Sequence, residues 1–175
     1  ILGGILMVFG HFFLSIEMPI FFYGSLGLII VGNGFFKPNI SSFVGELYAQ
    51  GDARRDSGFT IFYLGINLGA AIAPLLCAWF AITYGWHYGF VLAGIGMVVG
   101  LLVFRSGLKN NVFGNKGFVP NQQVYDQRSF GLNRGKLIVL ASIVSVGIFA
   151  TLVRFNEFEG YLVWIVSAFL VFYIG

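Results

Sequence analysis

Long apolar runs separated by short polar breaks predict helices that cross a membrane. Spanning the hydrocarbon core as a helix takes roughly 20 apolar residues. Six runs reach or approach this length: 1–16, 20–48, 59–84, 88–104, 136–153 and 161–175. Backbone in lipid must satisfy its own hydrogen bonds, and the alternation expected of barrel strands is absent. The pattern therefore predicts an all-α, polytopic membrane protein. Because the first and last runs are cut within apolar sequence, we expect a piece of a longer protein.

Composition agrees with this class and excludes others. Of the 175 residues, 58% are hydrophobic and 10% are charged, against about 45–50% and about 25% in soluble domains. The mean hydropathy is +0.87. The chain has no basic stripe suited to nucleic acid, so we expect no nucleic-acid partner. A single cysteine, Cys77, excludes an internal disulfide and a cysteine metal cluster. We expect no metal and no cofactor.

The distribution of Lys and Arg orients the predicted helices. Eight of the ten basic residues lie in or beside the segments 49–58 and 105–135. An even number of helices separates these segments, so they share one side, which the positive-inside rule makes cytoplasmic. Glu17 and His87 lie on the other side. An aromatic belt marks that outer boundary, with Tyr84, Trp86 and Tyr88. We expect a multi-pass protein of the cytoplasmic membrane.

Lys37 is the one charge placed inside an apolar run. An ionised Lys at bilayer depth costs about 2.5–3.5 kcal/mol on insertion scales. One interpretation is that its side chain snorkels to the cytoplasmic interface. Lys37 precedes Tyr48 by eleven residues, roughly 16 Å of helix, which disfavours snorkelling. We therefore expect Lys37 to face the bundle interior. The first four runs hold no acid at its depth, so we expect its carboxylate partner in a helix outside this chain.

Polar residues on two consecutive predicted helices indicate a shared cavity. Asn33, Lys37 and Ser41 fall on one face at i, i+4 spacing. Tyr63 and Asn67 share a face of the next helix, with Asn67 roughly 14 Å from its cytoplasmic end, a depth comparable to that of Lys37. An alternative for Asn33 and Ser41 is hydrogen bonding between helices, and both interpretations stay open.

Pro and Gly residues near Lys37 favour a bent helix that lines a cavity. Pro38 lacks a backbone N–H, and Gly32 and Gly34 add flexibility and remove side-chain bulk. Irregular backbone at membrane depth is tolerated where it lines a cavity. Two small-residue pairs at GxxxG spacing suit close helix packing: Gly65 with Gly69, and Gly96 with Gly100.

The segment from Gly32 to Gly69 closely resembles the proton-dependent oligopeptide transporter family of the major facilitator superfamily. The matching stretches are GNGFFKPNISSFVGELY, DARRDSGFTIFY and INLG. The resemblance implies that residues 1–104 are four helices of the N-terminal six-helix bundle, the third to the sixth. Residues 105–135 would form a cytoplasmic linker. Residues 136–175 would be a truncated form of the extra transmembrane hairpin that bacterial members carry between the two bundles.

The resemblance also implies roles for individual residues. Lys37 matches a fourth-helix lysine that engages the peptide carboxylate and takes part in proton coupling. Its acidic partner would lie in a Glu-x-x-Glu-Arg motif of the first helix, outside this chain. Asn67 matches an asparagine that hydrogen-bonds the peptide backbone, and Tyr63 matches a tyrosine of the same pocket. Asn33, on the Lys37 face, completes the candidate substrate-binding set.

The implied function is proton-coupled symport of di- and tripeptides by alternating access. One alternative keeps the fold and carries nitrate or another small anion, which a Lys-bearing cavity also suits. An intramembrane enzyme would need a nucleophile–base pair or clustered metal ligands at depth. No His, Asp or Glu stands beside a Ser or Cys at the depth of Lys37, so we do not expect an enzyme. A purely structural or channel-like subunit would leave Lys37 without a role.

Overall fold

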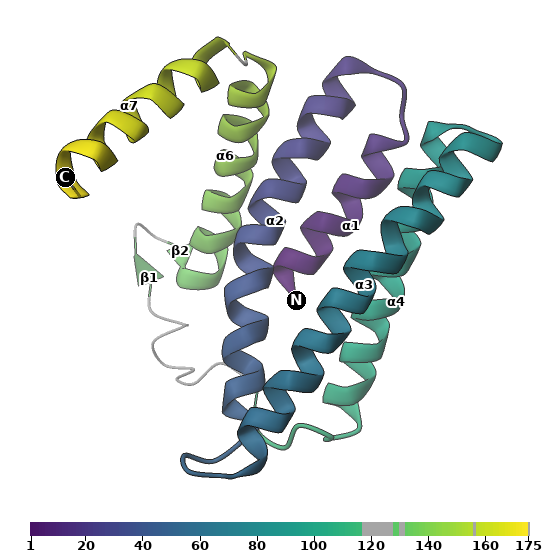
Figure 1. Cartoon of the computed structure of the whole chain (residues 1–175), viewed down its shortest axis with the longest axis vertical. Helices are drawn as coiled ribbons and strands as arrows, with labels where there is room; N and C mark the ends of the chain where they lie inside the picture. The colour runs from purple at the N-terminus through teal and green to yellow at the C-terminus, as the bar shows by residue number, and fades with distance from the viewer. Residues whose placement is uncertain (117–127, 130–131, 156, 175) are drawn as a thin grey trace.

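The computed structural model describes residues 1–116, 128–129, 132–155 and 157–174, and these are almost entirely helical (Figure 1). The helices are α1 Leu2–Leu14, α2 Pro19–Glu46, α3 Arg54–Tyr84, α4 Trp86–Lys109, α6 Arg134–Arg154 and α7 Glu157–Ile174. Two short antiparallel strands, β1 Arg128–Ser129 and β2 Leu132–Asn133, precede α6. The predicted all-α class is confirmed. Of the predicted linker 105–135, residues 117–127 and 130–131 lie outside the described part.

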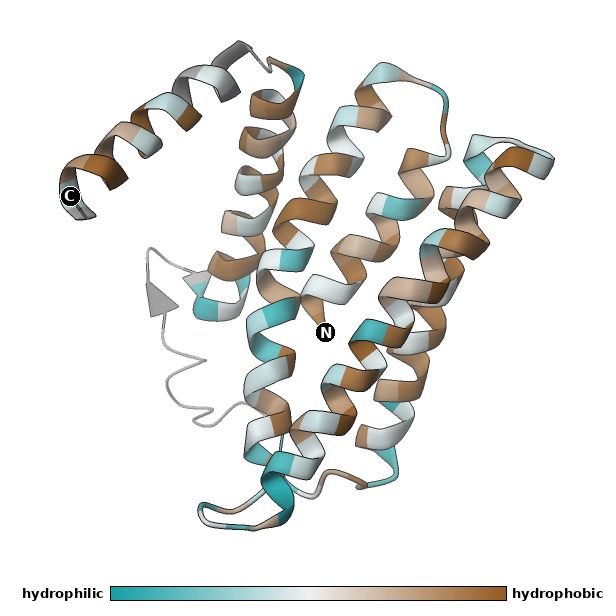
Figure 2. Ribbon diagram, viewed as in Figure 1, coloured by the Kyte–Doolittle hydropathy of each residue, from teal (hydrophilic) through white to brown (hydrophobic). Residues whose placement is uncertain are grey.

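Four helices in the described part of the chain are long and apolar enough to cross a membrane: α2, α3, α4 and α6. The first predicted span is shorter than a full crossing, because α1 has 13 residues, or about 20 Å of helix. Apolar turns dominate the spans, and hydrophilic residues gather in the loop between α2 and α3 (Figure 2). The chain is therefore built as an integral membrane protein.

Two helices extend beyond the ends that hydropathy predicts. α3 begins at Arg54 instead of near Phe59, and α4 continues to Lys109. A hydropathy pattern marks the lipid-facing part of a helix, whereas Arg and Lys are good helix formers that prolong it into water. Asp56 in the first turn of α3 and Lys109 in the last turn of α4 complement the helix dipoles. Both extensions lie on the predicted cytoplasmic side.

The helices pack in an order that differs from their order along the chain. α2 lies between α1 and α6, α1 also packs against α4, and α4 packs against α3. α2 and α3, although consecutive, share few contacts, and α7 meets only the end of α6 closely. Figure 1 shows α7 leaning away from the other helices. Much of the apolar surface of α3 and α7 is consequently exposed in this chain.

Glycines set the closest helix approaches. A Cβ on Gly32 would lie 2.6 Å from Met7 Cγ and 2.8 Å from the carbonyl oxygen of Gly3, so this residue permits the contact of α2 with α1. A Cβ on Gly27 would lie 2.6 Å from the carbonyl oxygen of Val146, so this residue permits the contact with α6. Of the two roles expected for Gly32, the removal of side-chain bulk is the one that this packing uses.

The GxxxG pairs do not make the contacts that their spacing predicts. A Cβ on Gly65, Gly69, Gly96 or Gly100 would meet nothing within 4 Å, and the same holds at Gly34. Small residues at this spacing permit close approach but do not supply a partner. Within the described part of the chain, these glycine faces of α3 and α4 are open.

Charged and aromatic contacts hold the loop that leads into α3. The Asp52 carboxylate accepts hydrogen bonds from the Arg54 backbone N–H at 2.9 Å and from its guanidinium at 2.9 and 3.1 Å. These bonds lower the pKa of Asp52 below its ordinary value. The Arg55 guanidinium lies 5.9 Å from the ring centre of Phe59. The Tyr48 ring packs against Gly58, which leaves no room for a Cβ there.

Candidate functional site

Lys37 lies in the interior of α2 with an exposed side chain. It precedes Glu46, the last residue of α2, by nine residues, or about 14 Å of helix. Across the described residues, no hydrogen bond or ion pair engages the Lys37 ammonium. Glu46 is the only acid in α2, at its C-terminal end. The expected carboxylate partner outside this chain stays a prediction.

A contact between α2 and α3 near their joined ends indicates the relative height of the two helices. A Cβ on Gly45 would lie 3.5 Å from Cζ of Phe59, so the two antiparallel helices meet there. Lys37 lies eight residues before Gly45, and Asn67 lies eight residues after Phe59. Each is therefore about 12 Å along its helix from the shared contact. The helical turn of α2 that carries Lys37 therefore lies level with the turn of α3 that carries Asn67.

The equal height of Lys37 and Asn67 does not appear when their distances are counted from the helix ends. α3 begins at Arg54, so Asn67 lies thirteen residues, or about 20 Å, from the helix start instead of the 14 Å that the sequence predicts. Lys37 lies slightly nearer to its helix end than predicted, because α2 ends at Glu46. Lys37 and Asn67 lie at the same height only when distances are counted from the contact of Gly45 with Phe59.

Two polar stripes continue the faces through which α2 and α3 meet. Steps of four residues keep the same face with a drift of about 40° per step. From Gly45, such steps reach Ser41, Lys37 and Asn33 on α2; from Phe59, they reach Tyr63 and Asn67 on α3. We call these sets the α2 stripe and the α3 stripe. Figure 2 shows hydrophilic turns midway along both helices. Both stripes start from the faces in contact and turn gradually away from them along their helices.

Local hydrogen bonds keep both stripes helical and leave their functional groups available. The Ser41 hydroxyl donates to the carbonyl of Lys37 at 3.2 Å, and the Asn67 side-chain N–H donates to the carbonyl of Tyr63 at 2.9 Å. Pro38 removes one backbone donor, yet α2 is continuous from Pro19 to Glu46. The amide oxygen of Asn67 remains free to accept a hydrogen bond from a ligand.

The chemistry of the stripes is suited to binding. An ammonium can pair with a carboxylate, an amide can bind peptide groups, and a phenol can donate or accept. Asn33, Lys37, Tyr63 and Asn67 are all exposed in this chain, so a ligand could reach each of them. The described residues contain no group of His, Cys, Asp and Glu that could hold a metal ion. These stripes can recognise a small zwitterion or anion.

Sequence reasoning did not bring together Glu17 and His87. The two residues are 70 positions apart, yet Nδ1 of His87 lies 3.6 Å from Oε1 of Glu17, at the end of the bundle where α1 ends and α4 begins. The only available signal was that both belong to the same predicted side of the membrane. Their pairing depends on how α1 and α4 pack.

The structure thus defines a polytopic helical membrane protein with exposed polar residues midway along two of its helices. The sequence model of the POT family, PTR2, matches residues 1–133. The chain belongs to this family. The family contains transporters rather than enzymes.

Two relatives show how much of the family's length the chain represents. It is 47% identical over 146 residues to the uncharacterized transporter YclF of Bacillus subtilis, covering 82% of this chain and 30% of that protein. It is 55% identical over 109 residues to the peptide transporter YePEPT of Yersinia enterocolitica, covering 59% of this chain and 21% of that protein. The chain therefore spans less than a third of either relative.

Solved structures agree on the fold. A crystal structure of a peptide transporter POT in complex with sulfate matches 97% of this chain and 30% of its own, with 38% identity and a TM-score of 0.65. A bacterial homologue of the human drug peptide transporters PepT1 and PepT2 matches with 27% identity and a TM-score of 0.72, over 97% of this chain and 38% of its own. The fold is part of the major facilitator fold of these transporters.

Proposed function

We propose that the protein containing this chain imports di- and tripeptides across the cytoplasmic membrane, driven by a proton gradient. The observation that supports the proposal is that Lys37 of α2 and Asn67 of α3 are both exposed and lie equally far along their helices from the contact of Gly45 with Phe59. The relatives named as peptide transporters support the same substrate class. The residues of this site, and not the fold alone, then decide what is carried.

Each residue has a distinct part in the proposed cycle. The Lys37 ammonium pairs either with the carboxylate of the peptide or with a carboxylate of a helix outside this chain. Exchange between these partners couples proton movement to peptide binding. The Asn67 amide binds the peptide backbone, and Tyr63 and Asn33 line the same cavity. The two bundles rock around this midplane site to expose it to either side.

The proposed orientation follows the basic residues. The segments 49–58 and 105–135 lie in the cytoplasm, residues 1–104 form four helices of the N-terminal bundle, and residues 136–175 form the extra hairpin. The partners are the peptide, protons, the lipid bilayer and the remaining helices of the fold. Nothing in the charge pattern suits nucleic acid.

Transport of nitrate or another small anion on the same fold is the second candidate. Lys37 alone would serve an anion equally well. Asn67 and Tyr63 could donate hydrogen bonds to an anion, but each also offers an acceptor oxygen, which a peptide N–H can use and nitrate cannot. The names of the relatives also favour peptides over nitrate.

Uptake into liposomes tests the proposal. The full-length protein containing this chain is reconstituted, and labelled dialanine is followed with and without an inward proton gradient. We expect accumulation above equilibrium only with the gradient, and competition by unlabelled tripeptide but not by nitrate. Uptake that ignores the gradient would contradict proton coupling. Nitrate uptake without dialanine uptake by folded protein would support the second candidate.

Asn67→Ala should weaken peptide binding without harming the fold. An uncharged hydrogen bond contributes about 0.5–1.5 kcal/mol, so we expect KM for dialanine to rise roughly twofold to tenfold. Helicity should not suffer, because alanine has the higher helix propensity. The matched control is Asn110→Ala, since Asn110 is exposed beyond the end of α4 and its side chain donates a hydrogen bond to the Ser106 hydroxyl. Equal KM values for both variants would remove Asn67 from the site.

A further inference from the structure

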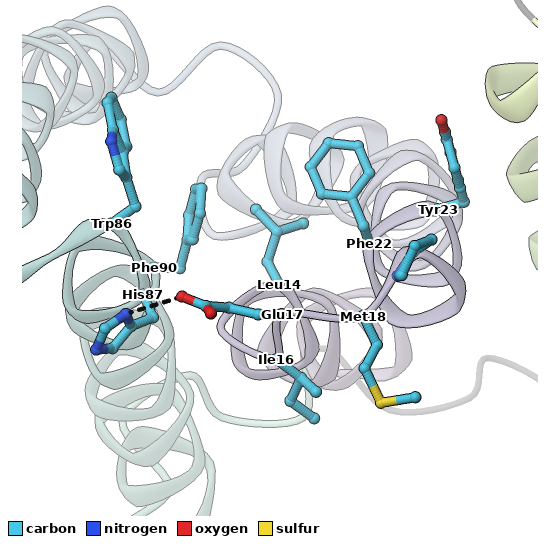
Figure 3. A pocket seen from close by; sticks show the side chains of 10 residues that line it. Leu14, Ile16, Glu17, Met18, Phe22, Tyr23, Trp86, His87 and Phe90 are labelled. Carbon is cyan, nitrogen blue, oxygen red and sulfur yellow. Dashed lines mark ion pairs between the residues drawn. The ribbon is translucent and has the colours of Figure 1, made fainter.

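A cavity of about 420 Å³ lies at the end of the bundle opposite the loop 49–58 (Figure 3). It forms where the connection between α1 and α2 meets the start of α4. Its polar and aromatic lining comes from Glu17, Phe22, Tyr23, Trp86, His87 and Phe90. None of these residues belongs to the α2 or α3 stripe. The cavity is therefore separate from the proposed peptide site.

The packing of α1 against α4 assembles this cavity. A Cβ on Gly94 of α4 would contact the Phe12 ring at 3.2 Å, and a Cβ on Gly4 of α1 would contact Leu101. These contacts bring the end of α1 to the start of α4, and with it Glu17 to His87. Gly85, with φ of 116°, turns the chain so tightly that the His87 ring lies over it, 3.0 Å from its Cβ position. The backbone turn at Gly85 thus positions His87, which forms one wall of the cavity.

The charges that line the cavity are suited to a cation. Glu17 is its only acid, with 86% of the side chain exposed, and no Lys or Arg lines it. The separation of 3.6 Å between Glu17 and His87 exceeds hydrogen-bonding distance, and the contact is an ion pair only when the imidazole is protonated. The carboxylate therefore keeps acceptor sites for another donor. Trp86 lines the same cavity and offers an aromatic face, which attracts cations.

The position of the cavity suggests where that cation comes from. In the proposed orientation, Trp86 and its neighbours Tyr84 and Tyr88 lie at the outer membrane boundary, the level of lipid headgroups. Exposed apolar side chains, Met18 and Phe22 among them, flank the carboxylate. A soluble amine would leave this apolar border in water, whereas a lipid would cover it with its acyl chains.

We propose that this cavity binds the headgroup of a phosphatidylethanolamine molecule from the outer leaflet. Its primary ammonium donates to the Glu17 carboxylate and lies against the Trp86 ring, and its acyl chains follow the apolar border toward the membrane interior. Phosphatidylglycerol offers no cation and should not be selected. The bound lipid would join the connection between α1 and α2 to the start of α4.

Native mass spectrometry of the full-length protein tests the selection directly. The purified protein is supplied with equal amounts of phosphatidylethanolamine and phosphatidylglycerol, and retained lipids are counted. We expect one phosphatidylethanolamine retained in preference. Because exposed charge pairs contribute less than about 1 kcal/mol, Glu17→Gln should lower its occupancy about threefold and leave phosphatidylglycerol unchanged. Glu46→Gln, the same substitution at the cytoplasmic end of α2, is the matched control and should have no effect.

A second pair of variants isolates the aromatic contact. Trp86→Leu should lower phosphatidylethanolamine occupancy, whereas Trp79→Leu should not, because Trp79 is an exposed tryptophan of α3 outside the cavity. Equal retention of both lipids by the native protein, or equal losses in Glu17→Gln and Glu46→Gln, would overturn the proposal. Displacement of the lipid by millimolar free ethanolamine would also overturn it, in favour of a soluble ligand. None of these measurements involves transport, so they stand apart from the test of the proposed function.

Discussion

Replacing Lys37 with alanine should abolish gradient-driven dialanine accumulation in proteoliposomes. Lys37 is the one cation on the α2 and α3 stripes, and no group in the described residues could replace it. Removing one member of a charge pair at a binding site costs about 2–5 kcal/mol. We therefore expect initial uptake to fall at least thirtyfold. Because Lys37 is exposed in this chain and engages no described side chain, the fold should survive the change.

Two further variants test whether the position of the lysine matters and whether its ability to release a proton matters. Lys109→Ala removes an exposed lysine at the cytoplasmic end of α4 and should transport normally. Lys37→Arg keeps a positive charge that does not deprotonate in proteins. It should retain exchange of labelled for unlabelled dialanine yet lose accumulation driven by the gradient. Accumulation by Lys37→Ala at the level of Lys109→Ala would remove Lys37 from both proposed roles.

Gly32→Ala should lower the stability of the protein by forcing α1 away from α2. The added Cβ would lie 2.8 Å from the carbonyl oxygen of Gly3 and 3.0 Å from the backbone nitrogen of Met7. Backbone atoms cannot rotate away, so α1 and α2 would have to separate. Overpacking of this kind costs about 1–3 kcal/mol. The free energy of unfolding of the full-length protein in detergent, measured by denaturant titration, should fall by this amount.

Gly34→Ala is the matched control for that measurement. Gly34 lies two residues along the same helix, and a Cβ there would meet nothing within 4 Å. Both substitutions gain helix propensity, worth up to about 1 kcal/mol. Gly34→Ala should therefore leave stability unchanged or raise it. If the two variants unfold alike, the close contact between α1 and α2 does not limit stability.

The hydropathy pattern predicted where the helices lie but not where they end. Lipid requires apolar side chains over a fixed thickness, so the pattern locates α2, α3, α4 and α6 directly. Outside the membrane, water can hydrogen-bond to the backbone of a helix or of an irregular segment. The extension of α3 to Arg54 therefore leaves no hydropathy signal. The GxxxG spacing also did not predict a contact correctly. Gly65 and Gly69 permit close helix packing, but no helix in the described part of the chain packs against them.

The sequence by itself determined the membrane class, the family and the identity of the unusual residue. Each follows from local information: long apolar runs, the stretch from Gly32 to Gly69, and a cost of burying charge that makes Lys37 stand out. Only the tertiary structure decided that Gly45 meets Phe59, that Gly32 meets Gly3, and that Glu17 meets His87. These pairs depend on which helix faces pack together. That choice is made by shape complementarity between residues far apart in the chain, which no periodicity along a single helix records.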